Sequence, residues 1–198
     1  FESDFSGWTT GGNTAIVTAY NLIRDLNDNT SGTESFAPFE GDKMAAISDP
    51  TLGGSLWSNY VLQDLTVGPD DNYLNFAYNF WTYDEAPFDD PGLLVEINGR
   101  TWFTAKAGDI GDGQTETLDF TGWNALSIPI AQYYDPVRPA SIRISFNAGN
   151  TGDAQFPSGA LIDGTSVSQS NAFPVVPVPT TALLLGSALV GVIGLRAN

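Results

Sequence analysis

The sequence contains neither cysteine nor histidine. The absence of cysteine excludes disulfides and thiol nucleophiles, and the absence of histidine excludes Ser-His-Asp triads and imidazole zinc sites. Only seven Lys and Arg residues oppose 23 Asp and Glu residues, so the formal net charge is −16. Nucleic acid is therefore not an expected partner, because phosphate contacts require clustered basic side chains. Calcium, or simply a solvated acidic surface, fits this charge better.

The length and composition predict one domain and a tail. Of 198 residues, 42% are hydrophobic and 12% are aromatic, which is enough to fill one core. The chain begins at Phe1 rather than Met. From this we expect that a secretory signal peptide was removed and that the protein is exported, to the cell surface or the extracellular space.

Alternating hydrophobic residues predict strands through most of the chain. In residues 73–81 the side chains of Leu74, Phe76, Tyr78 and Phe80 fall on one face, which is typical of a strand with one face in a core. Within 93–105, Asn98-Gly99 predicts a type I′ hairpin, because both positions need a positive φ. Further strands are predicted at residues 14–20, 43–48, 56–67, 125–131, 141–148 and 159–168.

These short strands predict an all-β fold, an antiparallel β-sandwich of the jelly-roll type, over residues 1–169. Residues 20–30 are expected to form a helical turn, and residues 108–116 a hairpin-type loop. A Pro-rich linker with Pro174, Pro177 and Pro179 follows at 170–179, where an extended conformation is favoured. Residues 180–198 are predicted to form an apolar, helical C-terminal segment.

The C-terminal segment carries no charge from Thr180 to Leu195. As a helix this run would be about 24 Å long, somewhat less than the hydrocarbon core of a bilayer. It is therefore a short membrane anchor, a sorting signal or a segment buried between subunits. Small residues at helical spacing favour close helix packing. The predicted assembly or anchor residues are Val176, Pro177, Pro179, Ala182, Gly186, Ser187, Gly191, Gly194 and Arg196.

The end of the chain resembles the sorting segment of PEP-CTERM proteins. The resemblance consists of Val176-Pro177-Val178-Pro179, an apolar helix and a basic end at Arg196. Val178 stands where that family has Glu, and one Arg replaces its basic cluster. The resemblance implies an exported surface protein that is sorted or anchored through its C-terminal segment.

The body is similar to jelly-roll domains that precede such segments and resemble carbohydrate-binding modules. This similarity is carried by residues 1–13, 121–130 and 159–167. Such modules hold a structural calcium between the first strand, an early loop and the last strand. The resemblance implies calcium ligands from the Glu2 and Asp163 side chains and from the backbone at Asp42 and Lys43. The alternative is that Glu2 and Asp163 are a terminal acid and a turn residue.

Aromatic side chains are candidates for a glycan-binding face, because flat rings stack on the apolar faces of sugars. The predicted glycan-binding residues are Trp81, Tyr83, Tyr133 and Tyr134, and the alternative for each is core packing. The acidic loop 83–92 contains Asp84, Glu85, Asp89 and Asp90. It is interpreted as a solvated loop, with a metal or partner contact or paired catalytic carboxylates as alternatives.

These observations predict two alternative functions, and neither of them is enzymatic. The first is a surface or extracellular-matrix structural protein that polymerises into filaments through its C-terminal segment, because exposed apolar surface must be buried somewhere. The second is a calcium-stabilised carbohydrate-binding module that the C-terminal segment sorts or anchors. The expected partners are copies of the chain itself, with membrane contact or a glycan as alternatives.

Overall fold

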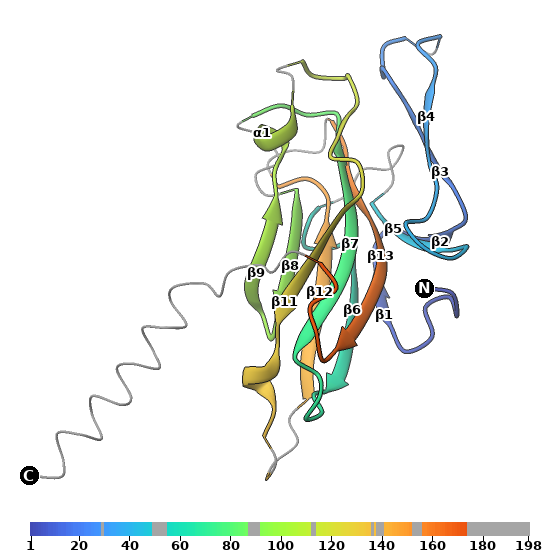
Figure 1. Cartoon of the computed structure of the whole chain (residues 1–198). Helices are drawn as coiled ribbons and strands as arrows, with labels where there is room; N and C mark the ends of the chain where they lie inside the picture. Colours follow the sequence, from blue (N-terminus) through green and yellow to red (C-terminus); the bar gives the residue numbers. More distant parts are fainter. Residues whose placement is uncertain are drawn as a thin grey trace, which may run out of the picture.

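Two antiparallel sheets pack face to face in the computed structural model (Figure 1). The structure describes residues 1–28, 30–48, 55–86, 92–111, 114–135, 137, 141–151 and 156–173. All pairings between its named strands are antiparallel, and of the two isolated bridges among the described residues the one between Ser55 and Asn150 is parallel. The predicted fold class, an antiparallel β-sandwich of the jelly-roll type, is confirmed.

The first sheet has the strand order β1-β6-β12-β8-β9. Its strands are β1 (Thr9–Gly11), β6 (Tyr60–Thr66), β12 (Ser141–Ala148), β8 (Leu93–Ile97) and β9 (Arg100–Ala105). The turn between β8 and β9 has φ values of 53° at Asn98 and 71° at Gly99. The predicted type I′ hairpin is therefore confirmed, since both central residues lie in the left-handed region.

The second sheet has the order β10-β7-β13-β5-β2, and β11 pairs with β7 as well. Its strands are β2 (Thr14–Val17), β5 (Met44–Ile47), β7 (Tyr73–Thr82), β10 (Asp119–Phe120), β11 (Asn124–Pro129) and β13 (Ser158–Ser168). The two longest strands, β7 and β13, lie side by side and form its centre. The short strands β1 and β10 were not predicted, because two or three residues show no alternation.

The main core lies between the two sheets. It contains the face of β7 that was predicted to be buried, and Phe76 contacts Phe146 of the opposite sheet with ring centroids 5.2 Å apart. The inward residues of β7 are Leu74, Phe76, Tyr78 and Phe80. The period-two pattern therefore predicted the correct face of this strand.

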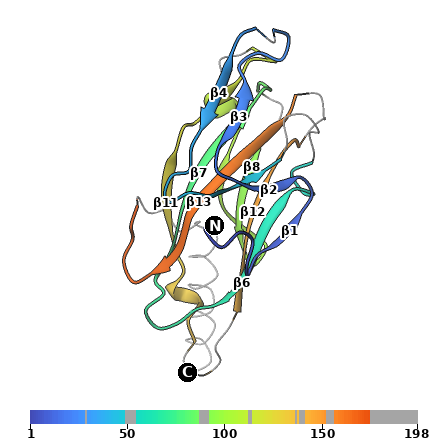
Figure 2. The same cartoon turned by 90° about the vertical axis from the view of Figure 1, so that its right-hand side faces the viewer.

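A second core covers the opposite face of the six-stranded sheet. A separate hairpin, β3 (Tyr20–Ile23) and β4 (Thr33–Phe36), stands beside β13 and covers this face (Figures 1 and 2). The buried residues of the second core are Leu22, Phe36, Met44, Ala46, Trp81, Tyr83, Leu118 and Leu161. The helical turn predicted over 20–30 is wrong, because Leu22 points into this core from a strand.

Two short helical turns lie in the loops. Helix α1 (Ala107–Ile110) follows β9, and the 3-10 turn η1 (Ala131–Tyr133) follows β11. The hairpin-type loop expected at 108–116 therefore begins instead as the end of α1. Among the residues that the structure describes, no helix is long and apolar enough to cross a membrane.

The end of the described chain turns back onto the second sheet. The amides of Ala172 and Phe173 donate to Asn75 Oδ1 at 3.2 Å and to Ser127 Oγ at 3.1 Å. The Phe173 ring contacts Phe39 edge to face, with centroids 6.0 Å apart. The chain is thus held by the sandwich as far as Phe173, and the predicted C-terminal segment, residues 180–198, lies outside the described residues.

Candidate functional site

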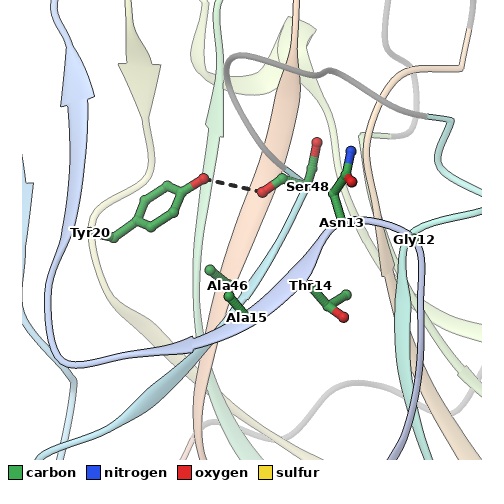
Figure 3. Close-up of a pocket in the computed structure, with 7 residues that line it drawn as sticks. All are labelled: Gly12, Asn13, Thr14, Ala15, Tyr20, Ala46 and Ser48. Carbon is green, nitrogen blue, oxygen red and sulfur yellow. Dashed lines mark hydrogen bonds between the residues drawn. The ribbon is translucent and has the colours of Figure 1, made fainter.

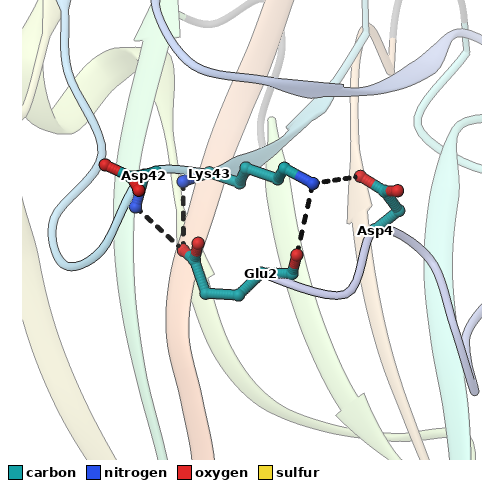
Figure 4. Close-up of polar contacts among 4 residues, drawn as sticks. All are labelled: Glu2, Asp4, Asp42 and Lys43. Carbon is teal, nitrogen blue, oxygen red and sulfur yellow. Dashed lines mark hydrogen bonds and ion pairs between the residues drawn. The ribbon is translucent and has the colours of Figure 1, made fainter.

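The residues predicted to bind calcium lie close to one another (Figure 4). Glu2 Oε1 accepts hydrogen bonds from the backbone N–H groups of Asp42 and Lys43, both at 3.0 Å. Asp163, which is 1% exposed, accepts from the N–H of Glu40 at 3.0 Å and of Gly164 at 2.8 Å. Glu2 and Asp163 therefore both bond to the backbone of one segment, residues 40–43.

These residues do not fit a calcium ion in this arrangement. Calcium needs six to eight oxygen ligands around one point. Here the segment 42–43 offers its N–H groups to Glu2, and the ammonium of Lys43 donates to the Glu2 carbonyl at 3.2 Å and to Asp4 Oδ1 at 2.8 Å. Within the described ranges, no three acidic side chains are grouped so as to hold a metal ion. Calcium binding stays an untested prediction.

The aromatic residues predicted to bind glycan do not form one face. Trp81 is 0% exposed and Tyr83 is 1% exposed, so neither ring can stack on a sugar at the surface. Both belong to the second core, which the β3–β4 hairpin covers. This part of the prediction is wrong, because both rings are buried. The sequence could not show this, since no local pattern indicates that the hairpin folds onto β7.

Tyr133 and Tyr134 lie at the other end of the sandwich from α1, in and after the yellow helical turn below β11 in Figure 1. Tyr133 packs against the main core, and Tyr134 is 38% exposed. They are therefore separated from Trp81 and Tyr83, and their role in glycan binding stays a prediction.

One cleft opens between the edges of the two sheets. It has a volume of about 480 Å³ and lies beside α1, between β9 and the β10–β11 segment. Three aromatic residues line it, namely Tyr78, Phe103 and Phe120. Its other lining residues are Thr104, Ala105, Asp109, Ile110, Thr121 and Asn124.

The floor of this cleft is aromatic and its rim is polar. The rings of Tyr78 and Phe103 are in contact, with centroids 4.8 Å apart and planes inclined by 50°. Burial, and secondarily the negative charge of Asp109, raises the pKa of Tyr78 above its ordinary value. Thr121 and Asn124 are held at the rim by bonds to the Gly122 carbonyl, at 2.7 and 3.3 Å.

A second cleft, of about 360 Å³, lies on the other side of Phe120. It is lined by Arg24, Glu34, Thr117, Leu118 and Phe120. Arg24 and Glu34 form an exposed ion pair at 2.8 Å across the β3–β4 hairpin. Phe120 is 40% exposed and supported by Phe36, with centroids 5.1 Å apart. One exposed ring is thus shared by both clefts.

A third cleft, of about 260 Å³, lies over the junction of β2 and β5 (Figure 3). The hydroxyl of Tyr20 closes one side by donating to the Ser48 carbonyl at 3.1 Å. The lining residues are Gly12, Asn13, Thr14, Ala15, Tyr20, Ala46 and Ser48. None of these side chains is charged, so the lining gives no electrostatic preference for an ionic ligand.

The acidic loop does not present an exposed pair of carboxylates in its described part. Asp84 is 2% exposed, and its Oδ1 accepts from the N–H of Glu85 at 2.8 Å. Asp89 and Asp90 lie outside the described residues. The same holds for the predicted assembly residues, which are Val176, Pro177, Pro179, Ala182, Gly186, Ser187, Gly191, Gly194 and Arg196.

The sequence did not single out Phe103, Asp109 or Phe120. Phe103 faces the cleft because the register between β8 and β9 shifts after Val95, and a period-two pattern does not show such a bulge. Phe120 belongs to a strand of two residues, which is too short for any pattern. The one available signal was the cluster of Gly and Asp around Asp109, which marks a loop.

The fold and the clefts define a jelly-roll β-sandwich domain with a groove between its sheet edges. No protein-family model matches the chain. An uncharacterized transporter of Schizosaccharomyces pombe is 30% identical over 87 residues, which are 44% of this chain and 8% of the relative. The chain therefore spans less than a tenth of that relative.

Two solved structures are similar to the chain at a low level. A CBM4 carbohydrate-binding module has a TM-score of 0.33 and 12% identity, covering 83% of this chain and 95% of the module. The enzymatically active domain of tailspike protein 4 from bacteriophage CBA120 has a TM-score of 0.30 and 15% identity. That match covers 83% of this chain and 19% of the tailspike chain. Similarity at this level carries no information on what the chain binds.

Proposed function

We propose that the protein is a non-enzymatic, exported glycan-binding module whose ligand lies in the cleft beside α1. The observation that carries this proposal is the composition of that cleft, in which Tyr78, Phe103 and Phe120 stand beside Thr104 and Asp109. Aromatic rings suit the apolar faces of sugar rings, and hydroxyl and carboxylate groups suit their hydroxyls. A neutral glycan fits best, since the net charge of −16 disfavours polyanions.

The position of Phe120 supports a ligand longer than one sugar. Its exposed ring borders both the cleft beside α1 and the second cleft, next to Arg24 and Glu34. A glycan chain that crosses Phe120 would contact both. Short oligosaccharides would reach only the first cleft, and longer ones would gain contacts with the ion pair.

Binding to a glycan array, followed by calorimetric titration of each positive glycan, tests the proposal. Phe120→Ala and Asp109→Asn should each weaken binding about tenfold or more, because an aromatic platform or a charge-assisted hydrogen bond contributes on the order of 1.5 kcal/mol. Tyr134→Ala is the matched control, since Tyr134 is exposed to 38% and Phe120 to 40%. Circular dichroism of each variant checks that it remains folded.

The results separate the possible sites. If Tyr134→Ala abolishes binding while Phe120→Ala does not, the ligand lies at η1 and the cleft beside α1 is not the site. If no glycan binds to the folded wild-type protein, the proposal is wrong. Arg24→Met should weaken the binding of long oligosaccharides alone, and an equal effect on short ones would contradict the extended ligand.

A second candidate function is self-assembly through the C-terminal segment. Two observations favour it: the uncharged run from Thr180 to Leu195, and the bond from Phe173 to Ser127, which holds the described chain to the sandwich up to residue 173. Electron microscopy of the full chain and of a chain ending at Phe173 tests this candidate. Ordered polymers should form from the full chain alone. Polymers from the shortened chain, or none from either, would exclude the segment as the connecting element.

A further inference from the structure

The first residues of the chain are held by two kinds of donor. Two adjacent backbone N–H groups, of Asp42 and Lys43, point at one oxygen of Glu2, and the Lys43 ammonium contacts two further oxygens, of Glu2 and Asp4 (Figure 4). Oxygen atoms of the first segment therefore converge on a positive charge. That charge belongs to a side chain of the protein itself.

The turn at Gly41 is shaped to receive a carboxylate. Its φ is +61°, and a Cβ there would lie 2.4 Å from Glu2 Oε1. Glycine favours this backbone conformation, and a Cβ there would displace the Glu2 carboxylate from the two N–H groups. Successive N–H groups in such a turn form a concavity that binds anions. The segment 41–43 therefore presents donors to Glu2, whereas a calcium site would need its carbonyl oxygens.

The last strand holds the same segment in the same way. The buried carboxylate of Asp163 accepts from the N–H of Glu40 at 3.0 Å. Carboxylates from the first segment and the last strand thus bond to N–H groups on one short stretch, residues 40–43. The connection between the two ends of the domain is complete without an ion.

We propose that Lys43 supplies the positive charge at the place where the sequence resemblance predicts calcium. The first segment is then held to residues 40–43 without a metal ion. This attachment matters for the core, because the first segment covers one end of it. Phe1 contacts Trp8 with ring centroids 5.0 Å apart, and Trp8 contacts Phe146 of the main core at 6.1 Å. Loss of the Lys43 contacts would loosen this aromatic cover.

Thermal unfolding of the full-length protein tests this inference, in EDTA and in millimolar calcium. The melting temperature of the wild type should be the same in both. Lys43→Met should lower it by about 2–4 °C, the shift that a modest loss of stability causes in a protein of this size. Lys43→Glu places a third carboxylate beside Glu2 and Asp4, so calcium should raise its melting temperature.

Arg24→Met is the matched control, because the Arg24–Glu34 pair has the same 2.8 Å separation as the Lys43–Asp4 pair. It should not respond to calcium. A wild-type melting temperature that falls in EDTA or rises in calcium would overturn the inference, as would an unchanged melting temperature in Lys43→Met. If Lys43→Glu does not fold, the wild type and Lys43→Met still decide the question.

Discussion

The indole ring of Trp81 lies directly on Gly159 of the neighbouring strand. A Cβ at Gly159 would be 2.3 Å from Cζ2 of that ring and 2.6 Å from the carbonyl oxygen of Ile47. Trp81 and Gly159 are paired in the β7–β13 register, and both lie on the face that the β3–β4 hairpin covers. The glycine thus makes room for the largest side chain of the second core.

Gly159→Ala should therefore destabilise the domain. Neither the indole nor the Ile47 carbonyl can move without disturbing the sheet, so we expect a loss of about 1–3 kcal/mol or more in the free energy of unfolding. Denaturant unfolding followed by tryptophan fluorescence measures it. Gly68→Ala is the control, since a Cβ there meets only the flexible carboxylate of Asp71, at 3.2 Å. Equal stability of the two variants would contradict the packing argument.

The second core shows where sequence patterns stop being informative. Alternation in β7 identified the face with Leu74 and Phe76, but Asn75, Asn79 and Trp81 on the other face are buried as well. The burial of Trp81 depends on a hairpin that joins neither sheet, whereas Asn75 is covered at Ala172, and no local pattern specifies where such segments dock. Trp81 was therefore predicted as a glycan-binding candidate with core packing as the alternative, and among the described residues it is the largest fully buried side chain.

Leu22→Ala tests whether the β3–β4 hairpin unfolds together with the sandwich. Leu22 is 1% exposed in the second core, and truncation of a buried leucine costs about 2–5 kcal/mol. Its neighbour Ile23 points outward with 39% exposure, so Ile23→Ala should change stability by at most about 0.5 kcal/mol. If Leu22→Ala leaves the global unfolding free energy unchanged, the hairpin is not part of the cooperative unit.

The candidate clefts were less predictable than the sheets, for a physical reason. Strand identity follows from local alternation, whereas a cleft depends on which edges meet. Phe103 and Phe120 are 17 positions apart, and a register shift and a two-residue strand bring them to one groove. The sequence resemblance placed Glu2 and Asp163 near the backbone of Asp42 and Lys43, with carbonyl oxygens as expected ligands. That this segment instead presents N–H groups became apparent only from the backbone at Gly41.

The end of the domain depends on a buried polar network. Ser127 donates to Asn75 Oδ1 at 2.6 Å and accepts from the N–H of Phe173 at 3.1 Å, and both side chains are at most 1% exposed. Ser127→Ala leaves the Phe173 amide without this partner, which should cost about 1–3 kcal/mol.

Hydrogen exchange provides the specific measurement for this variant. The amide of Phe173 should exchange faster in Ser127→Ala, because it loses its bond to the sheet, whereas the amide of Ala172 keeps its acceptor on Asn75. Ser145→Ala is a control on the outer face of the first sheet, where the Ser145 hydroxyl donates to Glu96 at 3.4 Å and accepts from Asn147 Nδ2 at 3.2 Å, away from residues 172–173. Unchanged exchange at Phe173 in Ser127→Ala would show that the bond from Ala172 to Asn75 and the Phe39 contact are enough to hold the chain.

The stability of the domain should fall at high pH through Tyr83. Burial raises the pKa of Tyr83 from its ordinary value of 10.0 to about 12, and its hydroxyl donates to the Ile23 carbonyl at 2.6 Å. Between pH 10 and pH 12 the unfolded chain has lost this proton while the folded chain retains it. The free energy of unfolding must then decrease with rising pH, by at most about 1.4 kcal/mol per pH unit for one proton. Below pH 10 both states are protonated and this dependence disappears.

Tyr83→Phe should make the decrease between pH 10 and pH 12 smaller, measured by denaturant unfolding at half-unit intervals. It should also lower stability by about 1 kcal/mol at pH 8, since the bond to Ile23 is lost. Part of the slope should remain, because the pKa of Tyr78 is raised as well. A Tyr83→Phe profile that parallels the wild type from pH 8 to pH 12 would mean that Tyr83 ionises equally in both states, and that the hairpin does not seal its hydroxyl from water.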